Sequence, residues 1–164
     1  MKTISKVNIP SIRSLLVITD LSDSGNKAIA LAFSILPSGG TIYLLHVMKE
    51  PPLPNPMYAN YSRDKFLTPD EKAKKMEQIR QSLQNLIPEE TAKAPVATRI
   101  EIIKTTRQSE IADEILGAAE KWGADGVCLT LRDRGPLGSL FSSSVAQAII
   151  KKSYLPLFIV RTER

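Results

Sequence analysis

Polar side chains that could bind an anion gather in a loop between residues 130 and 144. Ser142, Ser143 and Ser144 stand where a helix is expected to begin, and Arg132 and Arg134 lie earlier in the same loop. The backbone N–H groups and the dipole of a helix N-terminus favour negative charge. The arrangement therefore suits an anion, such as a nucleotide phosphate, at the end of a strand.

Two single residues restrict the other chemistry. His46 is the only histidine and Cys128 the only cysteine. We therefore expect no multi-histidine metal site, no multi-cysteine zinc site and no internal disulfide within one chain. Both residues lie in apolar segments and are expected to pack in the core, where a buried thiol is inert. Trp122 is likewise expected on the buried face of a helix.

The composition is that of an ordinary globular protein, with 43% apolar and 24% charged residues. A net charge of +5 raises the question of nucleic-acid binding. However, acidic and basic residues are interleaved over 70–80, and aromatic and basic residues form no stacking platform. No apolar run approaches the ~18 residues of a membrane span, and the first residues lack a signal peptide's apolar core. We therefore expect a cytoplasmic protein that binds neither nucleic acid nor membrane.

The elements that must position the loop alternate between apolar strands and amphipathic helices. We expect strands over 14–19, 41–47, 97–104, 126–131 and 157–160. We expect helices over about 23–36, 69–87, 108–122 and 143–152. A capping box from Thr68 to Glu71 marks the start of the second helix, and Gly123 marks the end of the third. The alternation predicts a parallel sheet covered on both faces, with ligands beyond the carboxyl ends of its strands.

A chain of 164 residues is expected to form one domain over residues 1–164. Its least regular part is 49–69, which holds five of the eleven prolines. At about 20 residues, this connection is longer than most in compact domains. We expect it to be either a functional lid or a flexible loop.

Four segments, in their order and spacing, resemble the universal stress protein family over nearly the whole chain. They are LLVITDLSDSGNKAIALAF at 15–33, LLHVMKEPP at 44–52, AAEKWGADGV at 118–127 and SSVAQAIIKKSYLPLFIV at 143–160. The resemblance implies a doubly wound α/β fold: one five-stranded parallel sheet of order 3-2-1-4-5, with helices on both faces. It also implies a homodimer.

Many members of that family bind ATP through Gly, two residues, Gly, nine residues, then Gly and Ser or Thr. In this sequence the frame falls on Thr130, Asp133, Ser143 and Ser144. The spacing is intact, but all three glycines are replaced, and glycine is what lets a backbone approach a phosphate closely. At a few ångströms and an effective dielectric of ~20, the charge of Asp133 would cost a triphosphate roughly 2–4 kcal/mol, which is about one to three decades of affinity.

The first functional hypothesis is a universal stress protein that does not bind ATP tightly. It would be a dimeric cytoplasmic stress-response or regulatory protein with no catalytic residues, metal or cofactor. An apolar sheet edge invites pairing, so the last strand is a candidate dimer seam, formed by Leu157, Phe158, Ile159 and Val160.

The alternative is a member that binds ATP or AMP with Mg²⁺ through a divergent loop, with weak or no hydrolysis. The family resemblance implies that its site would be lined by Asp20, Val47, Thr130, Arg132, Asp133, Ser143 and Ser144. Asp20 could instead organise the turn after the first strand. An adenylating or flavin-type α/β enzyme is disfavoured, because the chain has neither a second domain nor an intact glycine loop.

Overall fold

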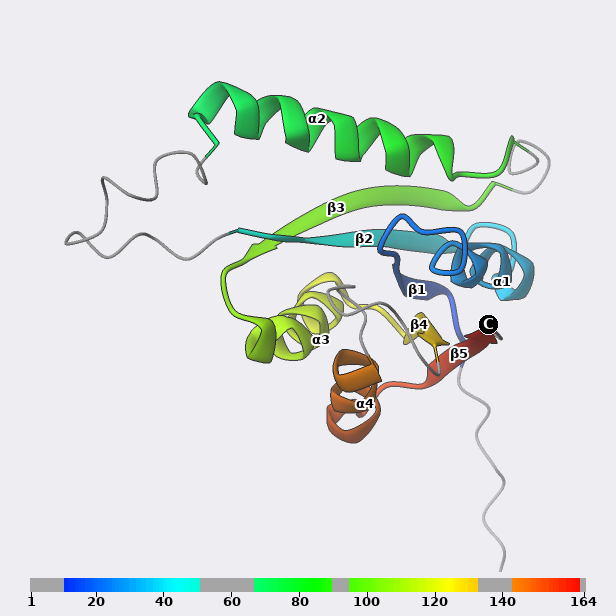
Figure 1. The fold of residues 1–164 in the computed structure, drawn as a ribbon. Coiled ribbons are helices and arrows are strands. Elements are labelled where there is room, and N and C mark those ends of the chain that lie inside the picture. The colour runs from blue at the N-terminus through cyan, green and yellow to red at the C-terminus, as the bar shows by residue number, and fades with distance from the viewer. Residues whose placement is uncertain (1–10, 51–66, 90–94, 133–142, 163–164) are drawn as a thin grey trace, which may run out of the picture.

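The computed structural model describes residues 11–50, 67–89, 95–132 and 143–162. Within them, five parallel strands form one sheet in the order β3-β2-β1-β4-β5 (Figure 1). The strands are β1 (Ser14–Ile18), β2 (Thr41–Lys49), β3 (Ala97–Thr105), β4 (Gly126–Arg132) and β5 (Leu157–Thr162). The expected strand order and the doubly wound α/β fold are thereby confirmed.

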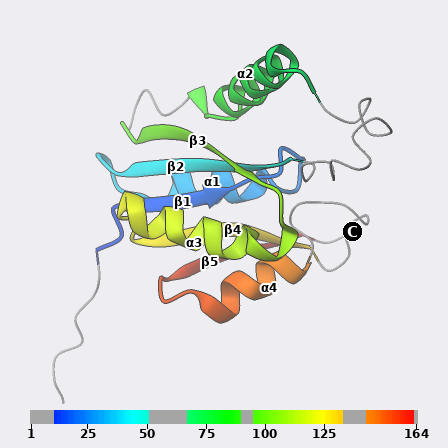
Figure 2. The same cartoon turned by 90° about the vertical axis from the view of Figure 1, so that its left-hand side faces the viewer.

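Helices cover both faces of the sheet. They are α1 (Lys27–Ile35), α2 (Pro69–Asn85), α3 (Ile111–Trp122) and α4 (Ser143–Lys152), with a 3₁₀ turn η4 (Gln108–Glu110) before α3. In Figure 2, α3 and α4 cross in front of the sheet, whereas α1 lies behind it and α2 lies beyond the β3 edge. Right-handed crossovers place consecutive helices in this way when the chain first winds outward from β1 and then returns across it.

The alternation of side chains along β1 divides the core into two layers. Leu16 and Ile18 belong to the core cluster that also contains the buried residues of α3 and α4, whereas Leu15 and Val17 belong to the cluster that contains those of α1 and α2. All four are at most 2% exposed. This burial on both faces explains the continuous apolar run in the sequence, as expected for a central parallel strand.

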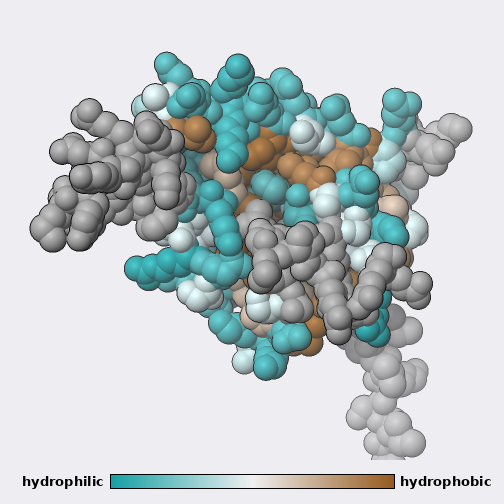
Figure 3. All heavy atoms as spheres, in the orientation of Figure 1, coloured by the Kyte–Doolittle hydropathy of each residue, from teal (hydrophilic) through white to brown (hydrophobic). Residues whose placement is uncertain are grey.

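Helix α2 begins and packs as its sequence predicts. Oγ1 of Thr68 accepts from the N–H of Glu71 at 3.3 Å, and the carboxylate of Glu71 accepts from the N–H of Thr68 at 2.7 Å. Only one narrow stripe of the helix is buried, centred on Ile79 and Leu83. Most of the other side chains of α2 are charged or polar, and hydrophilic side chains line this rim of the molecule in Figure 3.

Helix boundaries differ from expectation at two N-termini. Helix α1 begins at Lys27 rather than near residue 23, because side-chain hydrogen bonds hold the preceding residues in turns. The third helix begins as the 3₁₀ turn η4, where Oγ1 of Thr105 accepts from the N–H of Arg107 at 3.3 Å. The end of α3 is as predicted, with Gly123 at φ 66° in the left-handed region.

No helix within the described ranges is long and apolar enough to cross a membrane.

Candidate functional site

The loop that follows β1, residues 19–26, lies at the carboxyl ends of β1 and β4. Strand β1 pairs with β2 on one side and with β4 on the other. In the chain order, β2 follows β1 on one side and β4 returns on the other, so the strand order reverses at β1. Open α/β sheets bind ligands at such a reversal.

Asp20 organises the beginning of this loop. Its Oδ1 accepts a hydrogen bond from the N–H of Ser22 at 3.1 Å and a second, short one from the hydroxyl of Ser22. Oγ of Ser22 in turn accepts from the N–H of Gly25 at 3.1 Å. An aspartate that bonds the backbone two residues on forms an Asx turn. The structure thus gives Asp20 the turn role that the sequence left open beside a ligand role.

Thr19 and Asn26, the first and last residues of the same loop, are joined by a side-chain hydrogen bond. The hydroxyl of Thr19 donates to Oδ1 of Asn26 at 2.7 Å and accepts from the N–H of Leu21 at 3.0 Å. Asn26 occupies the N-cap position of α1, but its side chain makes no capping bond. Leu21 has φ 63°, a conformation that is uncommon for residues other than glycine. These bonds fix a backbone shape that Leu21 would not favour by itself.

Gly25 joins the loop to β4. A Cβ atom at this position would lie 2.2 Å from Oδ1 of Asp20 and 3.1 Å from Oγ of Ser22. The carbonyl oxygen of Gly25 accepts from the hydroxyl of Thr130 at 3.3 Å. Asp20 and Thr130, both predicted site residues, are therefore brought to the same glycine, which the sequence reasoning had not singled out.

His46 supports the loop from β2. It is 6% exposed, which confirms the prediction of a packed strand residue. Its Nδ1 lies 3.0 Å from the carbonyl oxygen of Thr19, so this nitrogen carries the proton and donates it. Burial lowers the pKa of His46, while the bond to Thr19 and the charge of Asp20 raise it and Lys75 lowers it further.

The remaining candidate residues are placed as follows. Val47 is fully buried in the layer that α3 and α4 cover. Thr130 is 7% exposed, and Ser144 is exposed in the first turn of α4. Asp133 lies outside the described residues, as do the side chains of Arg132 and Ser143. Within the described ranges, no group of three His, Cys, Asp or Glu side chains could hold a metal ion.

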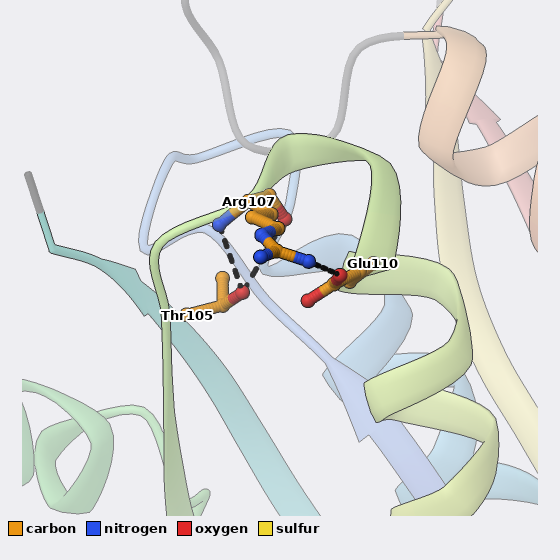
Figure 4. A network of polar contacts seen from close by, with 3 residues as sticks. All are labelled: Thr105, Arg107 and Glu110. Carbon is orange, nitrogen blue, oxygen red and sulfur yellow. Dashed lines mark hydrogen bonds and ion pairs between the residues drawn. The ribbon is translucent and has the colours of Figure 1, made fainter. Parts of the chain in front are cut away.

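Two cavities lie away from the strand ends, on the two sides of α3. One, of about 520 Å³, lies beside Ile103 of β3. The other, of about 600 Å³, lies beside residues 152–155. Glu110, which lines the first cavity, belongs to a small polar network (Figure 4). A side-chain nitrogen of Arg107 donates to Oε1 of Glu110 at 2.7 Å, and the N–H of Arg107 donates to Oγ1 of Thr105.

Comparison with known families decides the identity of this fold. The family model described as the universal stress protein family matches residues 11–161. The chain belongs to the universal stress protein family.

Solved structures of similar proteins agree with this assignment. The hypothetical protein MJ0577 is 22% identical, with a TM-score of 0.67 over 94% of this chain and 99% of that one. The universal stress protein UspA from Lactobacillus plantarum is 19% identical, with a TM-score of 0.60 over 94% of this chain and 100% of that one. A universal stress protein in complex with cAMP is 16% identical, with a TM-score of 0.55 over the same shares. No curated protein matches the chain.

At these identities, the solved structures establish the fold of this universal stress protein and not its ligand.

The loop after β1 contains functional-site residues that the sequence reasoning missed. Gly25, Ser22 and Asn26 carry the loop's hydrogen bonds, together with Thr19. Their signal was present as a run of Ser, Asp, Gly and Asn after an apolar strand, a composition typical of side-chain-stabilised turns.

Proposed function

We propose that this universal stress protein does not bind ATP tightly and acts as a regulatory protein without catalytic activity. One observation carries the proposal. Thr130, Asp133 and Ser143 stand at the three positions where nucleotide-binding members of the family have glycine. A side chain at each position keeps the backbone from approaching a phosphate closely.

The packing of Thr130 supports this proposal. The side chain is 7% exposed, and its hydroxyl donates to the carbonyl oxygen of Gly25. Strand β4 is thereby tied to the β1 loop by a side chain at the first of the three positions. A phosphate that approached the backbone here would have to displace a packed methyl group and break this bond.

The bonding of Asp20 supports it as well. Its Oδ1 accepts two hydrogen bonds from Ser22. Turning the carboxylate toward a nucleotide would break these bonds and release the turn that orients Ser22 and Gly25. Forming one contact at the expense of an existing network lowers the net gain of binding.

We further propose a cytoplasmic homodimer that forms through β5. This strand is at the end of the sheet order, and Ile159 on it is 36% exposed. An edge strand with unpaired backbone groups and apolar side chains is a template for pairing with a second copy. The candidate seam is formed by Leu157, Phe158, Ile159 and Val160.

A nucleotide-binding function is the second candidate, because one relative with a TM-score of 0.55 was solved in complex with cAMP. In that case ATP or AMP, with Mg²⁺, would lie over the β1 loop and the start of α4. The side chains of Arg132 and Ser144 would then offset part of the repulsion from Asp133.

Isothermal titration calorimetry with ATP, AMP and cAMP, each with and without Mg²⁺, separates the two candidates. We expect no saturable heat for ATP at micromolar concentrations. Saturable ATP binding with a Kd below about 50 µM, or roughly −6 kcal/mol, would overturn the first proposal. The absence of any binding heat with all three ligands at millimolar concentration would overturn the second proposal. A nucleotide released when the purified protein is denatured, seen by its absorbance, gives an independent check.

A further inference from the structure

The face of α3 that points away from the sheet lies at the surface of the molecule. It is formed by Asp113, Glu114, Gly117, Glu120 and Lys121, all of which are exposed. Figure 2 shows this helix at the front of the molecule, between β3 and α4. A cavity lies on each side of the helix, and Asp113 and Gly117 line both of them. We call this surface the outer face of α3.

The shape of the outer face suits a second helix. A Cβ atom on Gly117 would meet no atom within 4 Å, so the packing of the chain itself does not require glycine inside this helix, whereas a backbone that approaches closely does. The flanking cavities, of about 520 and 600 Å³, have apolar side chains in their walls. These are Ile103 and Trp122 on one side and Leu116 and Leu155 on the other, all half-buried. Ridges of a second helix pack into grooves of this kind.

The charges of the outer face are balanced but unevenly placed. Two acids are neutralised by ion pairs of 2.7 Å, which are Glu110–Arg107 and Asp113–Lys152. One acid and one base remain beside the first cavity, Glu114 and Lys121, and within the described residues neither belongs to an ion pair. They stand seven positions apart in the sequence, so about 10 Å separates them along the helix. On this side of α3, negative charge precedes Gly117 and positive charge follows it.

The partner that matches this pattern carries the same two charges in the reverse order. A second copy of α3 does so when it runs antiparallel to the first, with a twofold axis at Gly117. Lys121 of each copy then faces Glu114 of the other. Twofold interfaces are self-complementary in this way. The antiparallel arrangement also brings each helix N-terminus toward the C-terminus of the other helix, which the helix dipoles favour.

The other side of the outer face tolerates the same arrangement. Asp113 of one copy would approach Glu120 of the other there, and Lys152, which lines that cavity and pairs with Asp113, supplies the compensating charge. Tyr154 lines the same cavity and is fully exposed. Tyrosine is enriched at interfaces between proteins, and its ring is available to cover apolar side chains of a second copy.

We propose that the outer face of α3 is an interface between two copies of this chain, in which the α3 helices pack antiparallel across Gly117 and each Glu114 pairs with Lys121 of the other copy. Helix α3 has 12 residues and is therefore only about 18 Å long, so the contact is short and belongs to the small, weak class of interfaces. It forms whether or not copies also pair through β5. Contacts at both surfaces would join dimers into larger assemblies.

A disulfide at position 117 tests this contact, because the twofold axis brings the two Gly117 residues together, and a disulfide needs Cα atoms within about 4.4–6.8 Å of each other. Gly117→Cys is treated with a mild oxidant, and the covalent dimer is measured over time on non-reducing gels. The matched control is Ala73→Cys, which changes a small exposed residue within α2. The wild type gives the background of Cys128, which is fully buried. We expect Gly117→Cys to cross-link at least about tenfold faster than Ala73→Cys, because paired thiols react as if they belonged to one molecule.

The charge pattern is tested in the Gly117→Cys background. Glu114→Lys and Lys121→Glu each turn two attractive pairs into two repulsive ones, so each should slow cross-linking by roughly three- to tenfold. The double variant Glu114→Lys/Lys121→Glu should restore the rate. The two positions are not neighbours on one helix, where pairs interact three or four residues apart, so this rescue cannot arise within one chain.

Equal rates of cross-linking in Gly117→Cys and Ala73→Cys overturn the proposal. A double charge variant that cross-links as slowly as the single variants overturns the antiparallel pairing. Adding Ile159→Lys to Gly117→Cys should leave the rate unchanged, because Ile159 belongs to the edge strand β5. A loss of cross-linking in that variant would show that the contact depends on β5, and would overturn an independent interface on α3.

Discussion

Asp20 and Gly25 are in such close contact that the loop after β1 has no room for a side chain at position 25. A Cβ atom on Gly25 would lie 2.2 Å from Oδ1 of Asp20 and 3.2 Å from its Cγ. The backbone of Gly25 does not have positive φ, so the requirement for glycine here is one of space. The same two residues connect β1 with β4, since the carbonyl oxygen of Gly25 accepts from Thr130.

Gly25→Ala is expected to lower the free energy of unfolding by about 1–3 kcal/mol, the usual cost of overpacking. Gly117→Ala is the matched control. Gly117 is exposed within α3, and its added Cβ would meet no atom within 4 Å, so this change should stabilise the protein by roughly 0.5–1 kcal/mol. Urea unfolding measures both. A Gly25→Ala protein as stable as the wild type would show that Asp20 moves aside freely.

Stability should depend on pH through His46. Burial lowers its pKa, so the unfolded chain binds the proton more tightly than the folded protein does. The free energy of unfolding is therefore highest above the ordinary pKa of 6.5 and falls as the pH drops below that value. His46 is the only histidine, so thermal unfolding between pH 7.5 and 5.5 isolates this effect.

His46→Asn provides the comparison, since its amide can still donate to the carbonyl oxygen of Thr19. The variant should lose most of the pH dependence in that range. The ring protons of the single histidine also give its pKa directly by NMR. A value at or above 6.5 in the folded protein would contradict the prediction.

Removing the charge of Asp133 should raise the affinity for ATP. Asp133→Gly eliminates a repulsion of roughly 2–4 kcal/mol, which corresponds to about one to three decades in Kd. The triple variant Thr130→Gly/Asp133→Gly/Ser143→Gly restores the family's glycine pattern and should bind more tightly still. Calorimetry with MgATP measures both.

The control for this series is Asp23→Asn, which removes an exposed carboxylate from the β1 loop. It should change the affinity much less, because water and salt screen exposed charges. If the triple variant remains unable to bind ATP while folded, the replaced glycines are not what prevents binding.

The proposed dimer seam predicts different effects for two isoleucines of similar exposure. Ile159 on β5 is 36% exposed, and Ile35 at the end of α1 is 39% exposed. Ile159→Lys should shift the protein toward monomer, because it places a charge at the edge where a second copy would pair. Ile35→Lys should leave the molar mass of the dimer in solution unchanged. Light scattering at tens of micromolar compares them, and a monomeric wild type would remove the basis of the seam.

The strands and most helix ends could be predicted because their causes are local. The burial of β1 on both faces leaves a continuous apolar run, and the stop at Gly123 needs only the left-handed conformation that glycine provides. The capping box at Thr68 is likewise complete within four residues. Each signal is visible in a short window of sequence and does not depend on a distant partner.

The candidate site was less predictable because its contacts join distant segments. Asp20 leaves no room for a side chain at position 25. The carbonyl oxygen of Gly25 accepts a hydrogen bond from Thr130, which is 105 residues away in the chain. Helix α1 starts later than expected because Asp20 accepts from the N–H of Ser22 and Ser22 accepts from the N–H of Gly25, which holds the residues before Lys27 in turns. The groove beside α3 combines Ile103 with residues of a helix that follows it. No local pattern records such pairings.

Cys128 lies in β4 between its neighbours β1 and β5, fully buried, with Sγ 3.3 Å from the carbonyl oxygen of Ala28. Burial raises the pKa of its thiol to about 12, and only the thiolate reacts. The rate at which a thiol reagent labels Cys128 therefore measures how often the sheet opens, because the reagent can reach the thiol only when the central strands separate. Fraying of helix ends and motion of surface loops would leave this labelling rate unchanged.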